Sequence, residues 1–172
     1  MLISSYRYKE RDAAAECIYY LALIGDENAE IKPTKISGLL KGNTSLNPIN
    51  AVRKLKTIFM NELKYVQFIQ KITPLELIVN SAIDKIIEAV DRLKYKIRED
   101  ETFRITINKR HSHIDRNELI KAIADTISRR VDLKNPDKTI LIEIIGDKSG
   151  VSIIEKGDIL SIQKMRQKYM RI

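Results

Sequence analysis

Basic and histidine side chains cluster between residues 109 and 116. Lys109, Arg110 and His111 follow an alternating apolar segment, and His113 and Arg116 come just beyond. A strand followed by a helix is predicted here, and the N-terminus of a helix offers N–H groups and a positive dipole end to anions. Arginine adds charge-assisted hydrogen bonds to phosphate. These residues favour phosphate binding, although a charge run at a strand end can also be merely solvated.

A second candidate is a loop between a helix and a strand, with the sequence Val131-Asp132-Leu133-Lys134-Asn135-Pro136-Asp137. Its aspartates and its Asn-Pro pair are typical of a turn, and its two apolar side chains are expected to fill the core. Lys134 within the loop and Lys138 directly after it remain candidates for contact with nucleic acid.

The residues needed for metal binding or covalent catalysis are sparse. Cys17 is the only cysteine, and His111 and His113 lack a clear third ligand, so no metal site is predicted. Ser112 beside these histidines is no sign of a catalytic triad, because a triad is defined by geometry. No glycine-rich phosphate loop is found among the six glycines. We expect no catalytic residue and no cofactor.

Charge favours a polyanionic partner. The chain carries 31 lysines and arginines against 23 aspartates and glutamates, a net charge of +8, and the excess is larger after residue 100 than before it. The last residues form a basic tail without acidic residues, which is expected to be solvated and either holds RNA or aids solubility; its cations are Lys164, Arg166, Lys168 and Arg171. Tyr6, Tyr8, Tyr19 and Tyr20 either stack on bases or close a core.

Residues 1–72 show the element order βαββαβ. Strands are predicted at 2–8 and 65–72, with two short strands within 29–42. Helices are predicted from residue 11 to Gly25 and from Pro48, since proline is tolerated at the first helical position. This order is that of a ferredoxin-like unit, which we expect as the first domain.

Residues 73–172, including the basic tail, are expected to form the second domain. After an apolar turn at 75–79, a helix is predicted over 83–93 and a strand from 103. The next helix begins at Asp115, which has capping-box spacing with Glu118.

Arg129 and Arg130 are expected to mark the end of that helix. The apolar run 140–145 predicts a central strand, so that 103–145 makes a right-handed βαβ crossover. Val151–Ile154 returns as an antiparallel strand, and Leu160 and Ile162 are expected to continue the sheet. The predicted fold class is α/β (α+β), with a mixed sheet in the second domain.

Several motifs in the second half carry a family resemblance. They are Thr102-Phe103 followed by Lys109-Arg110-His111, then Val131-Asp132-Leu133 followed by Asn135-Pro136-Asp137, then Ile142-Glu143-Ile144-Ile145. In this order and approximate spacing they resemble the THUMP domain. The segment Ile36-Ser37-Gly38-Leu39-Leu40, followed by Thr44 and Pro48, is similar to archaeal stand-alone members of that group.

The resemblance implies an RNA-binding role. THUMP domains bind the acceptor end of tRNA in tRNA-modifying systems, usually after a ferredoxin-like unit, while another domain or subunit performs the chemistry. The group implied here assists the RNA cytidine acetyltransferase that forms N4-acetylcytidine on tRNA, in archaea and eukaryotes. The predicted RNA contacts are Lys109, Arg110, His111, His113, Arg116, Lys134 and Lys138, and charge reversal at Arg110 is expected to weaken binding while leaving the fold intact.

Other functions remain open. The chain could be the RNA-binding module or subunit of a tRNA thiouridine synthetase or methyltransferase, an RNA-modifying enzyme with an unrecognised active site, or a protein–protein adaptor. We expect a non-catalytic protein. The sequence has no apolar stretch of about 18 residues and no signal-peptide pattern, so we expect a cytoplasmic protein without a membrane partner.

Overall fold

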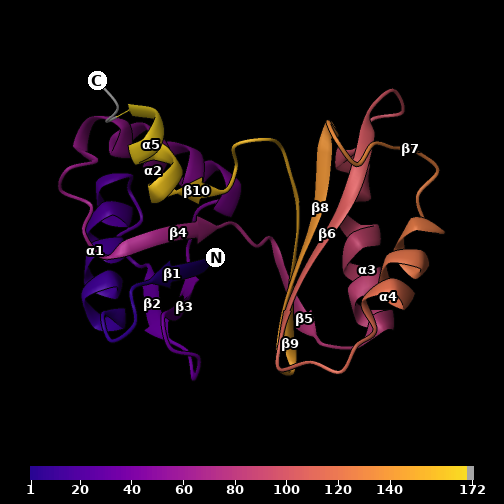
Figure 1. Cartoon of the computed structure of the whole chain (residues 1–172), viewed down its shortest axis with the longest axis horizontal. Coiled ribbons are helices and arrows are strands. Elements are labelled where there is room, and N and C mark those ends of the chain that lie inside the picture. Colours follow the sequence, from indigo (N-terminus) through magenta and orange to yellow (C-terminus); the bar gives the residue numbers. More distant parts are fainter. Residues whose placement is uncertain (170–172) are drawn as a thin grey trace. The chain divides into compact units, whose positions relative to one another are not determined.

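The structure, a computed structural model, describes residues 1–169, which fold into two compact units (Figure 1). The first unit contains Met1–Pro74 and the segment that begins at Gly157, and the second contains Leu75–Lys156. Each unit has an apolar core and a five-stranded sheet of its own. The predicted mixture of α and β structure is therefore confirmed.

The first unit has the predicted βαββαβ order. Its elements are β1 (Leu2–Ser5), α1 (Glu10–Leu23), β2 (Glu30–Pro33), β3 (Leu39–Asn43), α2 (Pro48–Glu62) and β4 (Ile69–Thr73). These strands form an antiparallel sheet in the order β4-β1-β3-β2, the arrangement of a ferredoxin-like fold. In this order each helix connects two strands that have a third strand between them.

Local sequence explains where the helices of this unit begin and end. The Asn47 side chain caps α2 by accepting hydrogen bonds from the N–H groups of Ile49 and Asn50, both at 3.1 Å. Pro48 then occupies the first helical position. Gly25 follows the end of α1 with a φ of 92°, a left-handed conformation that glycine adopts without strain.

The C-terminal segment belongs to the first unit, which corrects its predicted place in the second domain. Its strand β10 (Leu160–Ser161) pairs with β4, so Leu160 does not continue the sheet of the second unit. The helix α5 (Ile162–Tyr169) follows and buries Ile162 and Met165 in the first core. The Arg53 guanidinium also donates two hydrogen bonds, of 2.7 and 3.0 Å, to the carboxylate of Asp158.

The basic tail is therefore not the freely solvated segment that the sequence predicted. Up to residue 169 it forms the helix α5, because its apolar residues recur at helical spacing and find an apolar surface to cover. Lys164 and Lys168 are exposed, while the Arg166 guanidinium donates a 2.6 Å hydrogen bond to the Val66 carbonyl. Arg171 lies outside the described residues.

The second unit alternates strands and helices. Its elements are β5 (Leu77–Asn80), α3 (Ile83–Leu93), the short 3-10 helix η1 (Lys94–Lys96), β6 (Thr102–Arg110), α4 (Arg116–Ala124), β7 (Arg130–Val131), β8 (Lys138–Ile145) and β9 (Lys148–Ile154). The strand order is β5-β9-β8-β6-β7, in which β6 runs parallel to both β8 and β7. This confirms the predicted crossover and mixed sheet. Helices α3 and α4 lie on one side of the sheet (Figure 1).

Two details of the second unit differ from the prediction. The apolar segment after Pro74 forms the edge strand β5 and not a turn, because it pairs with β9. Helix α4 ends at Ala124 and does not reach Arg129 and Arg130. The Thr126 hydroxyl donates a 2.8 Å hydrogen bond to the Ile123 carbonyl and so satisfies an acceptor at the end of the helix. Arg130 belongs to β7, where it pairs with Thr102 of β6.

Within residues 1–169 the helices are too short or too polar for any of them to cross a membrane.

The cysteine of the first core offers a test of the fold. Cys17 is fully buried on α1, and burial raises the pKa of its thiol to about 12. We expect the native protein to react with a thiol reagent at pH 8 at least about a hundredfold more slowly than the urea-unfolded protein. A Cys17→Ser variant should give no signal. Comparable rates in the native and unfolded protein would contradict the burial of this side chain.

Candidate nucleic-acid interface

The crossover between β6 and α4 brings five of the predicted RNA contacts to one junction. β6 ends at Arg110, and α4 begins after Asp115, whose carboxylate accepts a 2.8 Å hydrogen bond from the N–H of Glu118. The Ser112 hydroxyl accepts a 3.2 Å bond from the N–H of Ile114, which shapes the connection. We call this junction the ledge; its members are Lys109, Arg110, His111, His113 and Arg116.

The turn between β8 and β9 is hydrogen-bonded to the end of β6, next to the ledge. The N–H of Gly146 donates a 3.0 Å hydrogen bond to the carbonyl of Arg110, so the end of β6 is held against this turn. His111 then has a φ of 52°, in the left-handed region that residues other than glycine rarely occupy. Strained conformations of this kind cluster at binding sites.

Most of the ledge is exposed, and its exposed cations are not held in ion pairs within the described residues. Lys109, His111, His113 and Arg116 are exposed, and none of them forms an ion pair within residues 1–169. The Lys109 ammonium donates a 2.9 Å hydrogen bond to the carbonyl of Ile114, which orients it but leaves its charge uncompensated. Four of the five members are thus exposed at this junction, where the Asp115 carboxylate also lies.

Arg110 differs from the other members because it is paired with a buried acid. Its guanidinium lies 3.1 Å from the carboxylate of Glu143, whose side chain is 1% exposed, compared with 39% for Arg110. The Asn108 amide donates to the other oxygen of Glu143 at 2.8 Å. The parallel register sets Asn108 directly beside Glu143, so two polar residues of β6 together satisfy the buried acid.

This pairing changes the expectation for Arg110. The sequence predicts a cation at this position whose charge can be reversed without harm to the fold. In the structure it also neutralises a buried carboxylate, because Glu143 interrupts an apolar strand and needs a partner. A lone glutamate within such a strand is the signal in the sequence that would have pointed to a neighbouring cation.

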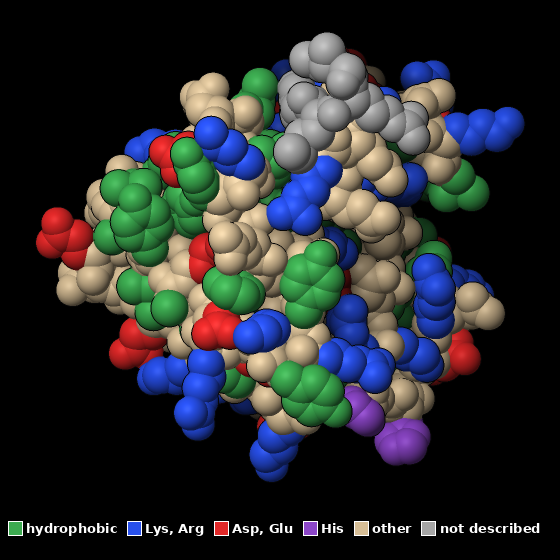
Figure 2. All heavy atoms as spheres, turned by 60° about the vertical axis from the view of Figure 1, so that its left-hand side comes forward, with side chains coloured by type: hydrophobic (Ala, Val, Ile, Leu, Met, Phe, Trp, Pro, Cys, Tyr) green, Lys and Arg blue, Asp and Glu red, His purple; other side chains and the backbone are tan. Residues whose placement is uncertain are grey.

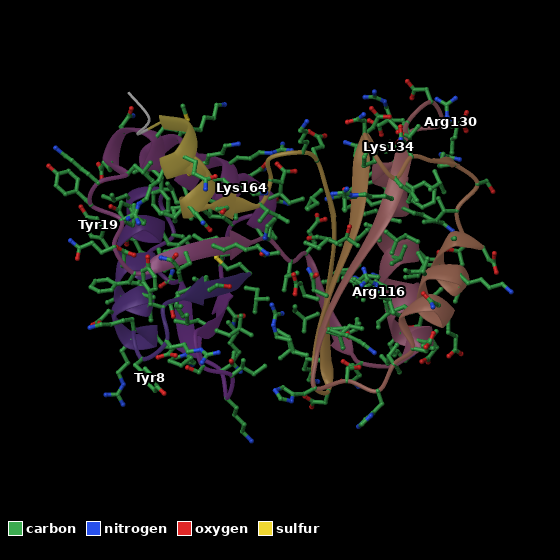
Figure 3. The ribbon with its side chains drawn as sticks, in the orientation of Figure 1. Tyr8, Tyr19, Arg116, Arg130, Lys134 and Lys164 are labelled. Atoms are coloured by element: carbon green, nitrogen blue, oxygen red, sulfur yellow. The ribbon has the colours of Figure 1, made fainter. Side chains whose placement is uncertain are left out.

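Lys134 and Lys138 lie at the other end of β6. Lys138 pairs in register with Phe103 at the start of this strand, whereas Arg110 ends it. Over this length a strand spans about 25 Å. Figure 3 accordingly shows Lys134 and Arg130 together at one end of the unit, away from Arg116.

Of these two lysines only Lys134 is available for a ligand. The Lys138 side chain is 15% exposed and forms ion pairs with Glu155 and Glu101, the latter at 3.7 Å. Its charge is therefore compensated by acidic side chains of the second unit. Lys134 is exposed, although Asp132 lies within hydrogen-bond distance of its backbone N–H.

The aspartates of the 131–137 loop have the structural role that was expected. Asp132 accepts hydrogen bonds from the N–H groups of Lys134 and Asn135, at 2.9 and 3.0 Å. Asp137 accepts from both the N–H and the hydroxyl of Thr102, each at 2.8 Å. Hydrogen bonds from these backbone N–H groups hold the pKa of both carboxyls below its usual value.

The two apolar side chains of this loop do not fill the core, so that prediction was wrong. Val131 is 53% exposed and Leu133 is 71% exposed. β7 is a two-residue edge strand, and the loop beyond it is held by polar bonds and not by apolar packing.

The first unit has a hollow of about 640 Å³, but its chemistry does not suit phosphate. Its lining contains three acids and four aromatic residues, namely Asp12, Glu16, Glu62, Tyr19, Tyr20, Tyr65 and Phe68. Carboxylates repel a polyanion. Residues 1–169 also contain no group of three or more His, Cys, Asp or Glu side chains arranged to hold a metal ion.

Comparisons with known proteins identify the second unit. Residues 80–154 match the THUMP domain family. Over 75 residues the chain is 40% identical to the uncharacterised protein MJ0421 of Methanocaldococcus jannaschii, a match that covers 41% of this chain and 21% of that protein. This chain thus spans about a fifth of the length of its curated relative.

Solved structures show the same fold over most of this chain. They include PH1313 from Pyrococcus horikoshii (TM-score 0.64, 21% identity, 90% of this chain and 55% of that chain). TrmN from Thermus thermophilus has a TM-score of 0.54 at 13% identity and covers 88% and 44%. A 4-thiouridine synthetase in complex with RNA and ATP has a TM-score of 0.50 at 15% identity and covers 93% and 41%.

The fold defines the class of this chain, an α+β protein of two units, each with a five-stranded sheet of its own. More particularly, its second unit contains a THUMP domain, as the motifs between Thr102 and Ile145 predicted.

Charge reversal at Arg110 should disturb the fold. In an Arg110→Glu variant we expect the free energy of unfolding to fall by about 1–3 kcal/mol, because buried Glu143 loses its cation. Adding Glu143→Gln should restore much of the loss, since an amide can donate to the new carboxylate. Urea denaturation measures both effects. Arg116→Glu is the control and should stay within about 0.5 kcal/mol of the native protein; an equal loss in this control would contradict a specific pair.

Proposed function

We propose that this chain binds the acceptor end of tRNA through the ledge and presents the tRNA to a separate modifying enzyme, without supplying a catalytic group. The observation that carries the proposal is the gathering of Lys109, His111, His113 and Arg116 at one exposed junction of a THUMP domain, without acidic partners within residues 1–169.

Recognition at the ledge depends on phosphates and shape. The helical acceptor arm of tRNA hides its base edges in a deep, narrow major groove, so protein side chains meet mainly phosphates and 2′-hydroxyl groups. Cations that displace condensed counterions provide affinity that falls steeply with salt. The N-terminus of α4 adds N–H groups and a positive dipole end beside Arg116.

The partner that we favour is the RNA cytidine acetyltransferase that forms N4-acetylcytidine. Support comes from the segment between Ile36 and Pro48, which resembles stand-alone THUMP proteins of that system. The alternative is a module or subunit of a thiouridine synthetase or methyltransferase, and the fold shared with a 4-thiouridine synthetase in complex with RNA favours it. An enzyme with an unrecognised active site is the rival from another class.

Charge reversal at the two ends of β6 tests the ledge. Arg116→Glu should weaken tRNA binding about tenfold and reduce the slope of log affinity against log salt by about one. Lys134→Glu makes the same charge change at the other end of the strand and should alter affinity less than about twofold. Filter binding over a salt series measures both. Equal losses would indicate diffuse attraction to the whole unit, and no loss in either variant would place the RNA elsewhere.

A reconstituted reaction tests the role of the partner. We expect the purified chain to leave tRNA unmodified with acetyl-CoA alone, and to raise the yield of N4-acetylcytidine when the acetyltransferase is added, because it lowers the cost of positioning the substrate. Mass spectrometry of digested tRNA measures the product. Arg116→Glu should reduce the stimulation. Turnover by the chain alone would support the enzyme hypothesis, and absence of stimulation would reject this partner.

A further inference from the structure

The turn between β1 and α1 in the first unit presents a tyrosine in an unusual way. The N–H of Lys9 donates a 3.2 Å hydrogen bond to the carbonyl of Tyr6, which closes a four-residue turn. Tyr8 is the third residue of this turn and has a φ of 65°, where glycine or asparagine is normally favoured. Its side chain is 90% exposed, so the ring contributes almost nothing to the core.

The strain at Tyr8 coincides with exposure. Among residues 1–169, only Tyr8 and His111 combine a side chain with a positive φ, and both lie at the surface. A glycine at position 8 would avoid the strain, and packing does not require a tyrosine there. Strain at an exposed aromatic residue points to a role outside the fold.

Glu10 holds the strained turn in place. One oxygen of its carboxylate accepts hydrogen bonds from the N–H groups of Tyr8 and Gly38, at 3.2 and 2.5 Å, and from the Ser37 hydroxyl at 3.3 Å. The bond from Gly38 is the largest cause that lowers the pKa of Glu10. Ser5 binds the same loop by donating to the Gly38 carbonyl at 2.9 Å. The turn is therefore fixed before any ligand arrives, which reduces the entropy lost on binding.

Cations flank the turn in the chain and in the loop that Glu10 holds against it. Arg7, Arg11 and Lys35 are exposed and have no ion-pair partner in the part of the chain that the structure describes. Lys35 belongs to the loop that Glu10 holds against the turn. Figure 3 shows Tyr8 at the end of the first unit where α1 begins, and Figure 2 shows exposed hydrophobic side chains, aromatic rings among them, interspersed with Lys and Arg and with some Asp and Glu.

We propose that this turn is a second RNA contact, in which Tyr8 stacks on an unpaired base while Arg7, Arg11 and Lys35 contact the neighbouring phosphates. A ring face can stack only on a base that is free of its own stack, so the ligand is single-stranded RNA and not a duplex. The surrounding positive charge excludes a cationic partner. This inference rests on the proposed function and adds a subsite on the first unit.

Fluorescence anisotropy with a labelled single-stranded oligoribonucleotide, and with a blunt RNA duplex of the same length, tests the stacking. Tyr8→Ala should weaken binding of the single strand about tenfold, while binding of the duplex stays within about twofold. Tyr8→Trp should bind the single strand at least as tightly as the native protein. Tyr19→Ala removes an exposed tyrosine from the acidic hollow of the same unit and should leave both affinities unchanged.

Tyr8→Gly separates stacking from folding. It should lose as much affinity for the single strand as Tyr8→Ala, yet unfold at a higher urea concentration than the native protein, because glycine accepts the left-handed conformation. Native affinity in Tyr8→Ala, or equal loss for single strand and duplex, would overturn the stacking site. If Arg116→Glu weakens tRNA binding while the Tyr8 variants do not, only this inference fails; if the native chain binds no RNA, the proposed function fails with it.

Discussion

The parallel pairing of β6 with β8 is the constraint on which the ledge depends. Parallel neighbours cannot be joined by a tight turn, so the chain must leave the end of β6 and cross over through α4 before it returns as β8. That crossover creates the strand-to-helix junction where the cations gather. The buried Glu143 fixes the same register, because both Asn108 and Arg110 of β6 reach it. Stability and the candidate function therefore share one interaction.

Several acidic residues in both units accept hydrogen bonds that stabilise the fold. Glu16 accepts hydrogen bonds from three successive N–H groups, those of residues 67–69, and Glu10 holds the turn at Tyr8. Asp26 is buried and binds Thr44 and Ser45, while Asp137 binds Thr102. These carboxylates accept hydrogen bonds from N–H and hydroxyl groups, and none of them is ion-paired with a cation of the ledge. With a net charge of +8, exposed cations outside ion pairs are the groups through which this chain could attract a polyanion.

Only the tertiary structure revealed several features of the candidate surface. The sequence predicts seven RNA contacts as a single set. In the structure, however, Lys138 forms ion pairs with Glu101 and Glu155, and Lys134 and Arg116 lie near opposite ends of β6. Proximity in the sequence does not reveal this, because the two ends of a strand are separated by its full extended length. The role of Tyr8 was equally hidden, since the sequence shows a tyrosine in a turn but not its backbone angle or exposure.

The sequence by itself determined the element order of residues 1–72, the crossover, the cap at Asp115 and the THUMP domain in the second unit. Periodicity, capping residues and local motifs act over a few neighbouring residues, so these features can be predicted locally. The tertiary structure decided which charges are free and where the C-terminal segment packs. Leu160 and Ile162 are apolar and could pack into the core of either unit. They pack into the first because Leu160 pairs with the free edge of β4. Pairing of charges and of edges depends on residues far apart in the chain, and local patterns carry no record of such contacts.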